Sequence, residues 1–191
     1  MNTPTFFISG HLDFTEDEFR QHYVPEIDKA LAQRPQVWFV VGDARGADTM
    51  AIAYLKERDA NIVVFHMLKE PRTKAMGIAV SGGYTSDAAR DAAMTAASTH
   101  DICWIRPGRE KSGTAKNLTR RSTIVEVSIT LKDYFKFDET LEALRLEGFH
   151  ATRQLRSIAV LTGRVAQERF WLLCKVPNVE EVGVQRAAEA L

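Results

Sequence analysis

Two short stretches of this chain combine glycine with residue types that bind anions, and each follows an apolar run. GDARGADT spans residues 42–49 and comes directly after the run at 36–41, while KSGT spans 111–114 and follows the run at 101–106. Glycine lets the backbone approach a ligand closely, and the start of a following helix offers unpaired N–H groups with partial positive charge. Two such loops at neighbouring strand ends favour a site for a phosphate group.

Side chains in these stretches have the chemistry to bind the rest of such a ligand. Arg45 carries a planar guanidinium that can hold a phosphate through two hydrogen bonds. Ser112 and Thr114 add hydroxyl donors where a helix is predicted to start. Asp48 falls in the first turn of another predicted helix, where the dipole favours a carboxylate or where it can reach a sugar hydroxyl. Taken singly, each stretch also fits an ordinary turn between a strand and a helix.

The elements that must position these residues alternate between strands and helices. Strands are expected at 5–9, 36–41, 61–66 and 101–106, and helices at 15–32, 47–58, 86–98 and 114–121. The strands are apolar on both faces, which predicts a parallel sheet with helices on each side. Ligands bind such sheets at the carboxyl ends of the strands, where both glycine stretches fall.

Two further segments of this region carry local signals. Thr15 and Glu18 have the spacing of a capping box, and Pro25 predicts a kink or a split in the helix that they begin. Residues 67–85 contain Pro71 and three glycines, which predicts a long connection at the ligand-facing end. Such a connection is either a lid or specificity element, or a surface loop with no special role.

The ordered set GDARGADTMA, RDAAM, HDICWI and SGTAKN resembles the motifs of the SLOG superfamily of Rossmann-like nucleotide-binding domains. This superfamily includes LOG-type phosphoribohydrolases and DprA-type single-strand DNA binders. The resemblance covers residues 4–121 and implies a Rossmann-like fold with a phosphate site and a cleft for the base or ribose. The implied phosphate contacts are Gly42, Arg45, Gly46, Ser112, Gly113 and Thr114. The implied cleft residues are Gly10, His11, Arg90 and Asp91, and the expected ligand-binding set also includes Asp43, Asp48 and Asn117.

One departure from the LOG-type pattern bears on catalysis. These enzymes carry a glutamate three residues after the threonine of the second loop, and this chain has Asn117 there. Hydrolysis of an N-glycosidic bond needs a carboxylate to stabilise positive charge on the sugar and a base for water. Asn117 can bind a ribose hydroxyl but supplies no charge. Asp48 and Asp91 are the catalytic candidates, and Asp13 and Asp43 are open alternatives that the spacing does not separate from them.

The C-terminal third has a different pattern. Residues 126–131 alternate like a half-exposed strand, and 138–147 read as a capped helix that Gly148 ends. A strand at 157–165, a helix at 167–175 and a strand at 179–184 follow. This order predicts a small ferredoxin-like α+β module at 123–191, after a Rossmann-like domain at 1–122. Alternatively, 126–131 is the last strand of the first sheet.

Composition narrows the classes of partner. The 191 residues include 25 Lys and Arg and 25 Asp and Glu, so zero net charge argues against coating nucleic acid or membranes. The N-terminal segment lacks the pattern of a signal peptide, and no apolar run is long enough to span a membrane, so a cytoplasmic location is expected. His11 and His66 lack a clear third ligand, so neither a metal nor a further cofactor is expected.

The sequence therefore predicts a binding module or sensor for a nucleotide or a nucleotide-derived phosphorylated ligand. In this interpretation the C-terminal module transmits the signal or dimerises, and the protein is expected to be a homodimer. The alternative is an enzyme that hydrolyses the N-glycosidic bond of a nucleoside monophosphate, with an aspartate in place of the missing glutamate. A single-strand DNA binder is the second alternative, disfavoured by the zero net charge and the absence of an aromatic stacking track.

Overall fold

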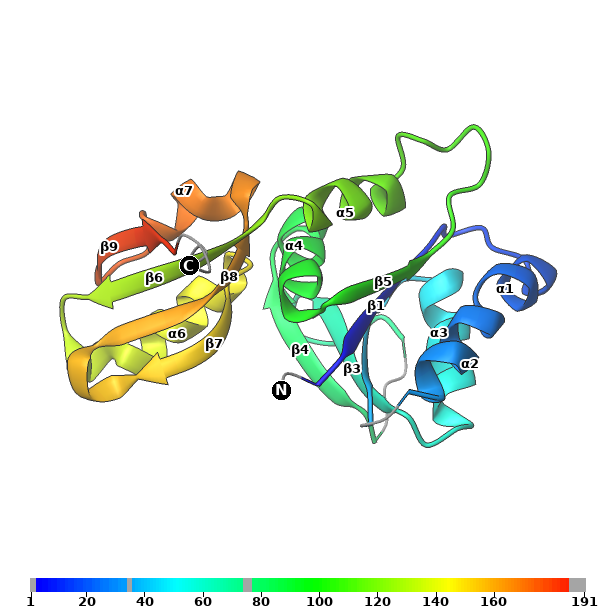
Figure 1. Ribbon diagram of the computed structural model, residues 1–191, viewed down its shortest axis with the longest axis horizontal. Helices are drawn as coiled ribbons and strands as arrows, with labels where there is room; N and C mark the ends of the chain where they lie inside the picture. Colours follow the sequence, from blue (N-terminus) through cyan, green and yellow to red (C-terminus); the bar gives the residue numbers. More distant parts are fainter. Residues whose placement is uncertain (1–2, 34–35, 74–76, 186–191) are drawn as a thin grey trace, which may run out of the picture.

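The computed structural model describes residues 3–33, 36–73 and 77–185 of the chain. Its elements form two parts that lie side by side, each built on its own sheet (Figure 1). We call them the parallel-sheet part and the antiparallel-sheet part. In chain order, the parallel-sheet part contains β1 (Thr5–Ser9), α1 (Glu16–His22), α2 (Val24–Leu31), β2 (Trp38–Gly42), α3 (Ala47–Lys56), β3 (Asn61–Met67), β4 (Ala79–Tyr84), α4 (Asp87–Ala97), β5 (His100–Cys103) and α5 (Gly113–Arg121).

The sheet of the parallel-sheet part has the strand order β4-β3-β2-β1-β5, and every neighbouring pair is parallel. Successive residues of β1 show how both of its faces are covered. Phe6 and Ile8 belong to the apolar cluster that includes residues of α1, α2 and α3, whereas Phe7 belongs to the cluster that includes residues of α4. All three side chains are buried. The prediction of a parallel sheet with helices on both faces is therefore confirmed.

The helical segment predicted at 15–32 is split in two. Thr15 caps α1 by accepting a hydrogen bond from the backbone N–H of Glu18, whose side chain accepts one from the backbone N–H of Thr15. This reciprocal pair is the predicted capping box. Pro25 lies at the start of α2, where its missing N–H costs no helical hydrogen bond. The expected split is confirmed, with Tyr23 between the two helices.

The connection predicted at 67–85 contains a strand, so this prediction was wrong in part. β4 pairs with β3 at the edge of the sheet. The glycines in the segment suggested a loop, but Gly82 is required by packing, since a Cβ there would lie 2.0 Å from the His66 ring. Edge strands tolerate such glycines. The connection between β3 and β4 is therefore shorter than predicted, and its residues 74–76 are outside the described range.

The antiparallel-sheet part has the strand order β7-β8-β6-β9, with every neighbouring pair antiparallel. Its elements are β6 (Ile124–Leu131), η1 (Tyr134–Lys136), α6 (Phe137–Leu146), β7 (His150–Leu155), η2 (Arg156–Ile158), β8 (Val160–Ala166), η3 (Gln167–Arg169), α7 (Phe170–Leu173) and β9 (Val179–Val184). The strand predicted at 126–131 therefore belongs to this second sheet and not to the first.

Three sequence predictions for this part need correction. The strand β7 was not predicted, because an edge strand of sequence HATRQL lacks a regular apolar pattern. The strand predicted from Ser157 begins at Val160, since η2 turns the chain between β7 and β8. The helix predicted at 167–175 is the short turn η3 followed by a single turn of α7. The helix α6 and the closing strand β9 are confirmed, but α6 begins at Phe137 and its N-cap residue Lys136 forms no side-chain capping hydrogen bond.

The two parts are joined by charged contacts as well as by the chain itself. Arg145 of α6 donates hydrogen bonds to Ser81 Oγ (2.9 Å) and to the carbonyl of Gly82 (2.7 Å), both on β4. Arg120 of α5 pairs with Glu168 of η3 at 2.7 Å. Among the described helices, none has the length and apolar character that a membrane crossing needs.

Candidate functional site

The chain changes direction across the parallel sheet at β1. From β1 it steps outward through β2, β3 and β4, and it then returns through α4 to β5 on the other side of β1. The crevice outside the carboxyl ends of β1 and β5 is thus the switch point of this sheet, the usual ligand site in open α/β sheets. A hydrogen bond of 3.1 Å from the Arg106 backbone N–H to His11 Nε2 joins the two loops that flank it.

A cavity of about 590 Å³ lies at this switch point, and we call it the ligand cavity. It collects residues from the loops after β1, β2 and β5 and from α4. Ten residues of the predicted ligand-binding set line it: Gly10, His11, Arg45, Asp48, Arg90, Asp91, Ser112, Gly113, Thr114 and Asn117. The other three, Gly42, Asp43 and Gly46, do not line it.

Gly42 and Gly46 shape the walls of the site and do not approach the ligand cavity themselves. A Cβ on Gly42 would lie 2.3 Å from Asp48 Oδ2, so the glycine makes room for that carboxylate. Gly46 has φ +80° and a Cβ there would lie 2.4 Å from the carbonyl oxygen of His11. The same carbonyl accepts the backbone N–H of Ala47, the first residue of α3. One backbone N–H at the start of α3, where a phosphate contact was predicted, is therefore already bonded to the loop after β1.

The start of α5 is different, because it opens into the ligand cavity. Ser112 caps α5 by accepting a hydrogen bond from the backbone N–H of Ala115 (3.3 Å). A Cβ on Gly113 would meet no atom within 4 Å, so the space beside this residue is empty. Ser112, Gly113 and Thr114 all line the cavity. This helix end therefore presents partial positive charge to the cavity.

Arg45 is the cationic group that the site leaves without an internal partner among the residues described. Its side chain is exposed, lines the ligand cavity and forms no ion pair with any described residue. The other arginines at the cavity are paired. Arg109 forms a 3.1 Å ion pair with Asp13, and Arg72 and Arg90 both pair with Asp43.

Asp43 is a fully buried carboxylate that organises one wall of the site. It accepts hydrogen bonds from the backbone N–H, Nε and a terminal nitrogen of Arg72, at 2.9, 3.0 and 2.6 Å, and one from Arg90 at 3.2 Å. Burial alone would raise the pKa of Asp43, but the bonds from Arg72 and the two positive charges outweigh it and lower the pKa. Asp43 therefore stays ionised and positions the arginines, which explains why the predicted ligand-binding residue does not line the cavity.

Two carboxyl groups in the cavity have the opposite electrostatic character. Burial raises the pKa of Asp48 to about 7, against which the hydrogen bond from the Ala44 backbone N–H and the charge of Arg90 act only partly. Burial also raises the pKa of Asp91, although Arg90 donates hydrogen bonds to it at 2.9 and 3.2 Å. A carboxyl with a pKa near 7 can take up or release a proton at physiological pH.

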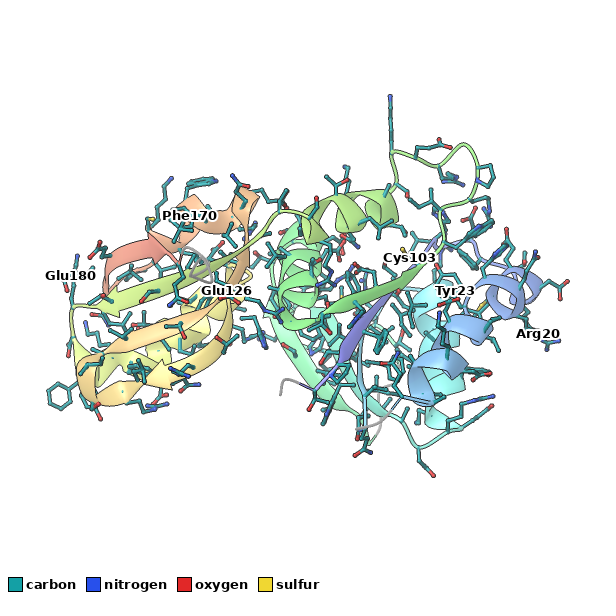
Figure 2. All side chains as sticks on the ribbon, viewed as in Figure 1. Arg20, Tyr23, Cys103, Glu126, Phe170 and Glu180 are labelled. Carbon is teal, nitrogen blue, oxygen red and sulfur yellow. The ribbon has the colours of Figure 1, made fainter. Side chains whose placement is uncertain are left out.

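The loop after β1 is fixed by neighbours from several elements. The buried His11 ring stacks on Phe14, and burial together with Arg106 lowers the pKa of His11, so it stays neutral at physiological pH. Tyr23 lies beside the end of β5, where Cys103 is labelled (Figure 2). Its hydroxyl donates to the Ser9 carbonyl (2.7 Å) and accepts the Trp104 backbone N–H (3.1 Å). The ends of β1 and β5 are thereby held at a fixed separation.

The sequence did not single out two charged residues of this cavity. Arg72 lies in the connection between β3 and β4, and it reaches Asp43 across a separation of 29 residues that no local pattern signals. Asp87 is in the first turn of α4, where an acidic residue is ordinary, and it lies 3.1 Å from Arg90. No cluster of three or more His, Cys, Asp or Glu side chains that could hold a metal ion occurs in the described ranges.

Comparisons of the chain with models of known protein families, with curated proteins and with solved structures gave no match.

Proposed function

We propose that this protein binds a nucleotide or a nucleotide-derived phosphorylated ligand in the ligand cavity. The observation that carries the proposal is the meeting of Arg45 and the start of α5 at one cavity at the switch point of a parallel sheet. Both features attract a phosphate group, and no acidic side chain of the described residues forms an ion pair with Arg45 or caps the start of α5. The same cavity is also lined by Asp48, Asp91 and Asn117, whose side chains suit the hydroxyl groups of a sugar.

We also infer two domains from the arrangement of the apolar clusters. Two clusters draw all their buried members from the parallel-sheet part, and the third draws all of its members from the antiparallel-sheet part. This supports a Rossmann-like domain at 1–122 and a smaller domain at 123–191. The order β6-α6-β7-β8-α7-β9 and the antiparallel sheet support a ferredoxin-like class for the second domain.

A thermal-shift screen with matched ligands tests the binding proposal. The panel should contain nucleoside monophosphates, the corresponding nucleosides without phosphate, and inorganic phosphate alone. We expect a rise in Tm with at least one monophosphate and a smaller rise with its nucleoside, because ligand binding to the native state stabilises it. A panel without any shift, or equal shifts with a monophosphate and its nucleoside, would contradict a phosphate site.

The raised pKa of Asp48 favours N-glycosidic hydrolysis as a second candidate function. Asp48 and Asp91 both line the cavity, and a carboxyl with a pKa of about 7 suits proton transfer. The position of Asn117 argues the other way, since the LOG-type enzymes that the sequence resembles have a glutamate there. Ligand binding without turnover therefore stays the preferred proposal.

Asn117→Glu separates the two functions. We expect the unmodified protein to release little or no free base from nucleoside monophosphates, and the variant to release it slowly, because the carboxylate stabilises positive charge developing on the ribose. Asn117→Gln introduces a side chain of the same length as glutamate but without its charge, and it serves as the control. Chromatography of overnight reactions gives the result. Rapid base release by the unmodified protein, lost in Asp48→Asn or Asp91→Asn, would reverse the ranking of the two functions.

A further inference from the structure

Arg120, in the last turn of α5, is a buried charged residue that no sequence motif signals. Its side chain is 8% exposed, and it binds in two directions. One terminal nitrogen donates a 2.5 Å hydrogen bond to Asn117 Oδ1, and Nε donates a 2.7 Å bond to Glu168 Oε1. Asn117 lines the ligand cavity, whereas Glu168 belongs to η3 of the antiparallel-sheet part. Arg120 therefore connects the cavity wall to the neighbouring part.

This contact fixes which way the Asn117 amide points. A guanidinium has only donors, so the amide oxygen must face Arg120 and the amide nitrogen must point away from it. The nitrogen donates to no described residue, while its side chain borders the cavity. Asn117 therefore offers a hydrogen-bond donor to a ligand, which suits a hydroxyl, carbonyl or phosphate oxygen.

Arg120 also acts on the acidic wall of the cavity. Its positive charge is one of the influences that lower the pKa of Asp91, against the larger effect of burial, which raises it. The same guanidinium thus orients one cavity residue and favours the ionised form of another.

We propose that Arg120 is a positioning residue of the ligand cavity, and that Glu168 of the antiparallel-sheet part holds it in place. The site is then complete only when that part is docked against α5. This inference rests on the proposed function, because it concerns the same cavity. It adds a route, from Glu168 through Arg120 to Asn117, by which the antiparallel-sheet part controls ligand affinity.

The competing explanation is that the Arg120–Glu168 pair only fastens the two parts together. Arg145 provides a matched control, because it also crosses between the parts, donating to Ser81 Oγ and to the Gly82 carbonyl, and it does not line the cavity. A fastening role predicts similar effects of removing Glu168 and Arg145 on ligand affinity. A positioning role predicts an effect of Glu168 alone.

Calorimetry with the best-binding nucleoside monophosphate distinguishes the two explanations. We expect Glu168→Ala to weaken binding about three- to tenfold, and Glu168→Gln, which keeps an acceptor for Arg120, to recover part of the loss. Arg145→Gln should bind like the parent. In an Asn117→Ala background, Glu168→Ala should have a much smaller further effect, since the amide that Arg120 positions is gone and only its influence on Asp91 is left. An equal loss in that background, or an equal loss in Arg145→Gln, would overturn the inference.

A ligand-free measurement keeps this inference separate from the proposed function. In ¹⁵N-labelled protein, Glu168→Ala should shift the Arg120 Nε–Hε and the Asn117 side-chain amide resonances, and Arg145→Gln should leave both in place. If no phosphorylated ligand binds the parent, the proposed function fails and these resonances alone decide the role of Arg120. Unchanged Asn117 amide resonances in Glu168→Ala would overturn it.

Discussion

Asp48 shows how burial gives a single residue a measurable pH dependence. Its pKa rises from 3.8 to about 7 in the fold, so the folded state holds a proton that the unfolded state has lost across that range. By linkage, this group lowers the free energy of unfolding as pH rises from about 4 to 7, and the full penalty persists above pH 7. The raised pKa is therefore a cost to stability that the fold tolerates at the cavity.

Asp48→Asn removes this penalty while keeping an acceptor for the Ala44 N–H. The variant should be more stable than the parent, and this difference in free energy of unfolding should be about 2 to 3 kcal/mol larger at pH 8 than at pH 5. Urea denaturation at the two pH values measures the difference. The same gain at both pH values would show that Asp48 has an ordinary pKa.

Arg45 is the residue whose removal should weaken phosphate binding most cleanly, because it has no internal partner among the described residues to release. We expect Arg45→Ala to weaken ligand binding by about 1.5 to 3 kcal/mol, the range for hydrogen bonds to charged groups. Calorimetry gives the change, and circular dichroism checks that the fold is intact. An unchanged affinity in a folded variant would remove Arg45 from the site.

Sequence reasoning named most of the residues that line the ligand cavity, and the structure shows contacts for three of the predicted residues that the sequence did not signal. Gly42 and Gly46 were predicted to contact phosphate, yet they leave room for the Asp48 carboxylate and for the loop after β1. Asp43 was predicted to bind ligand and instead holds Arg72 and Arg90. A glycine pattern reports that a close approach is needed, and only the three-dimensional structure shows what approaches.

At the scale of the element, the start of α5 is the feature that separates a binding loop from a turn. Gly113→Val should abolish ligand binding and leave the fold in place, because the added side chain enters empty space beside the helix start and fills the room a phosphate needs. Thr119→Val, on the same helix but away from the ligand cavity, is the control. Thermal-shift measurements with nucleotides compare both variants with the parent. Normal binding by Gly113→Val would show that this loop is a turn without a role in ligand binding.

The central strands of the parallel sheet were predicted from the sequence, whereas two of the four edge strands, β4 and β7, were missed. β1, β2 and β3 have continuous apolar runs because both of their faces are covered. In β4 and β7, which lie at sheet edges, runs of small or polar residues (SGG at 81–83 and TRQ at 152–154) interrupt the apolar pattern. Part of the connection predicted at 67–85 is therefore the strand β4.

At the scale of the whole molecule, Arg145 ties the edge of the parallel sheet to α6 through two hydrogen bonds to β4. We expect Arg145→Ala to lower the free energy of unfolding by about 1 to 3 kcal/mol, because Gly82 loses a charged donor between the two parts. Arg156→Ala breaks an exposed ion pair within the antiparallel-sheet part and should lower the free energy of unfolding clearly less than Arg145→Ala does, because solvent screens exposed pairs. Equal losses in urea denaturation would show that Arg145 is an ordinary surface residue.

The contacts between the two parts lay beyond what the sequence could predict. Arg120 and Glu168 are 48 residues apart, and Arg145 and Ser81 are 64 apart. No periodic pattern connects such positions, because the pairing depends on how two independently patterned sheets pack together. The sequence therefore indicated two modules and a cavity in one of them, but not the dependence of that cavity on its neighbour.

The central claim is that a phosphorylated nucleotide binds at the switch point of the parallel sheet. Titration of ¹⁵N-labelled protein with a nucleoside monophosphate, followed residue by residue through the backbone amides, tests it most directly. The account predicts saturable shifts centred on Gly10, Arg45 and Gly113, with β7 and β9 unaffected. Shifts that do not saturate, or that centre on the antiparallel-sheet part and leave Gly113 in place, would contradict it.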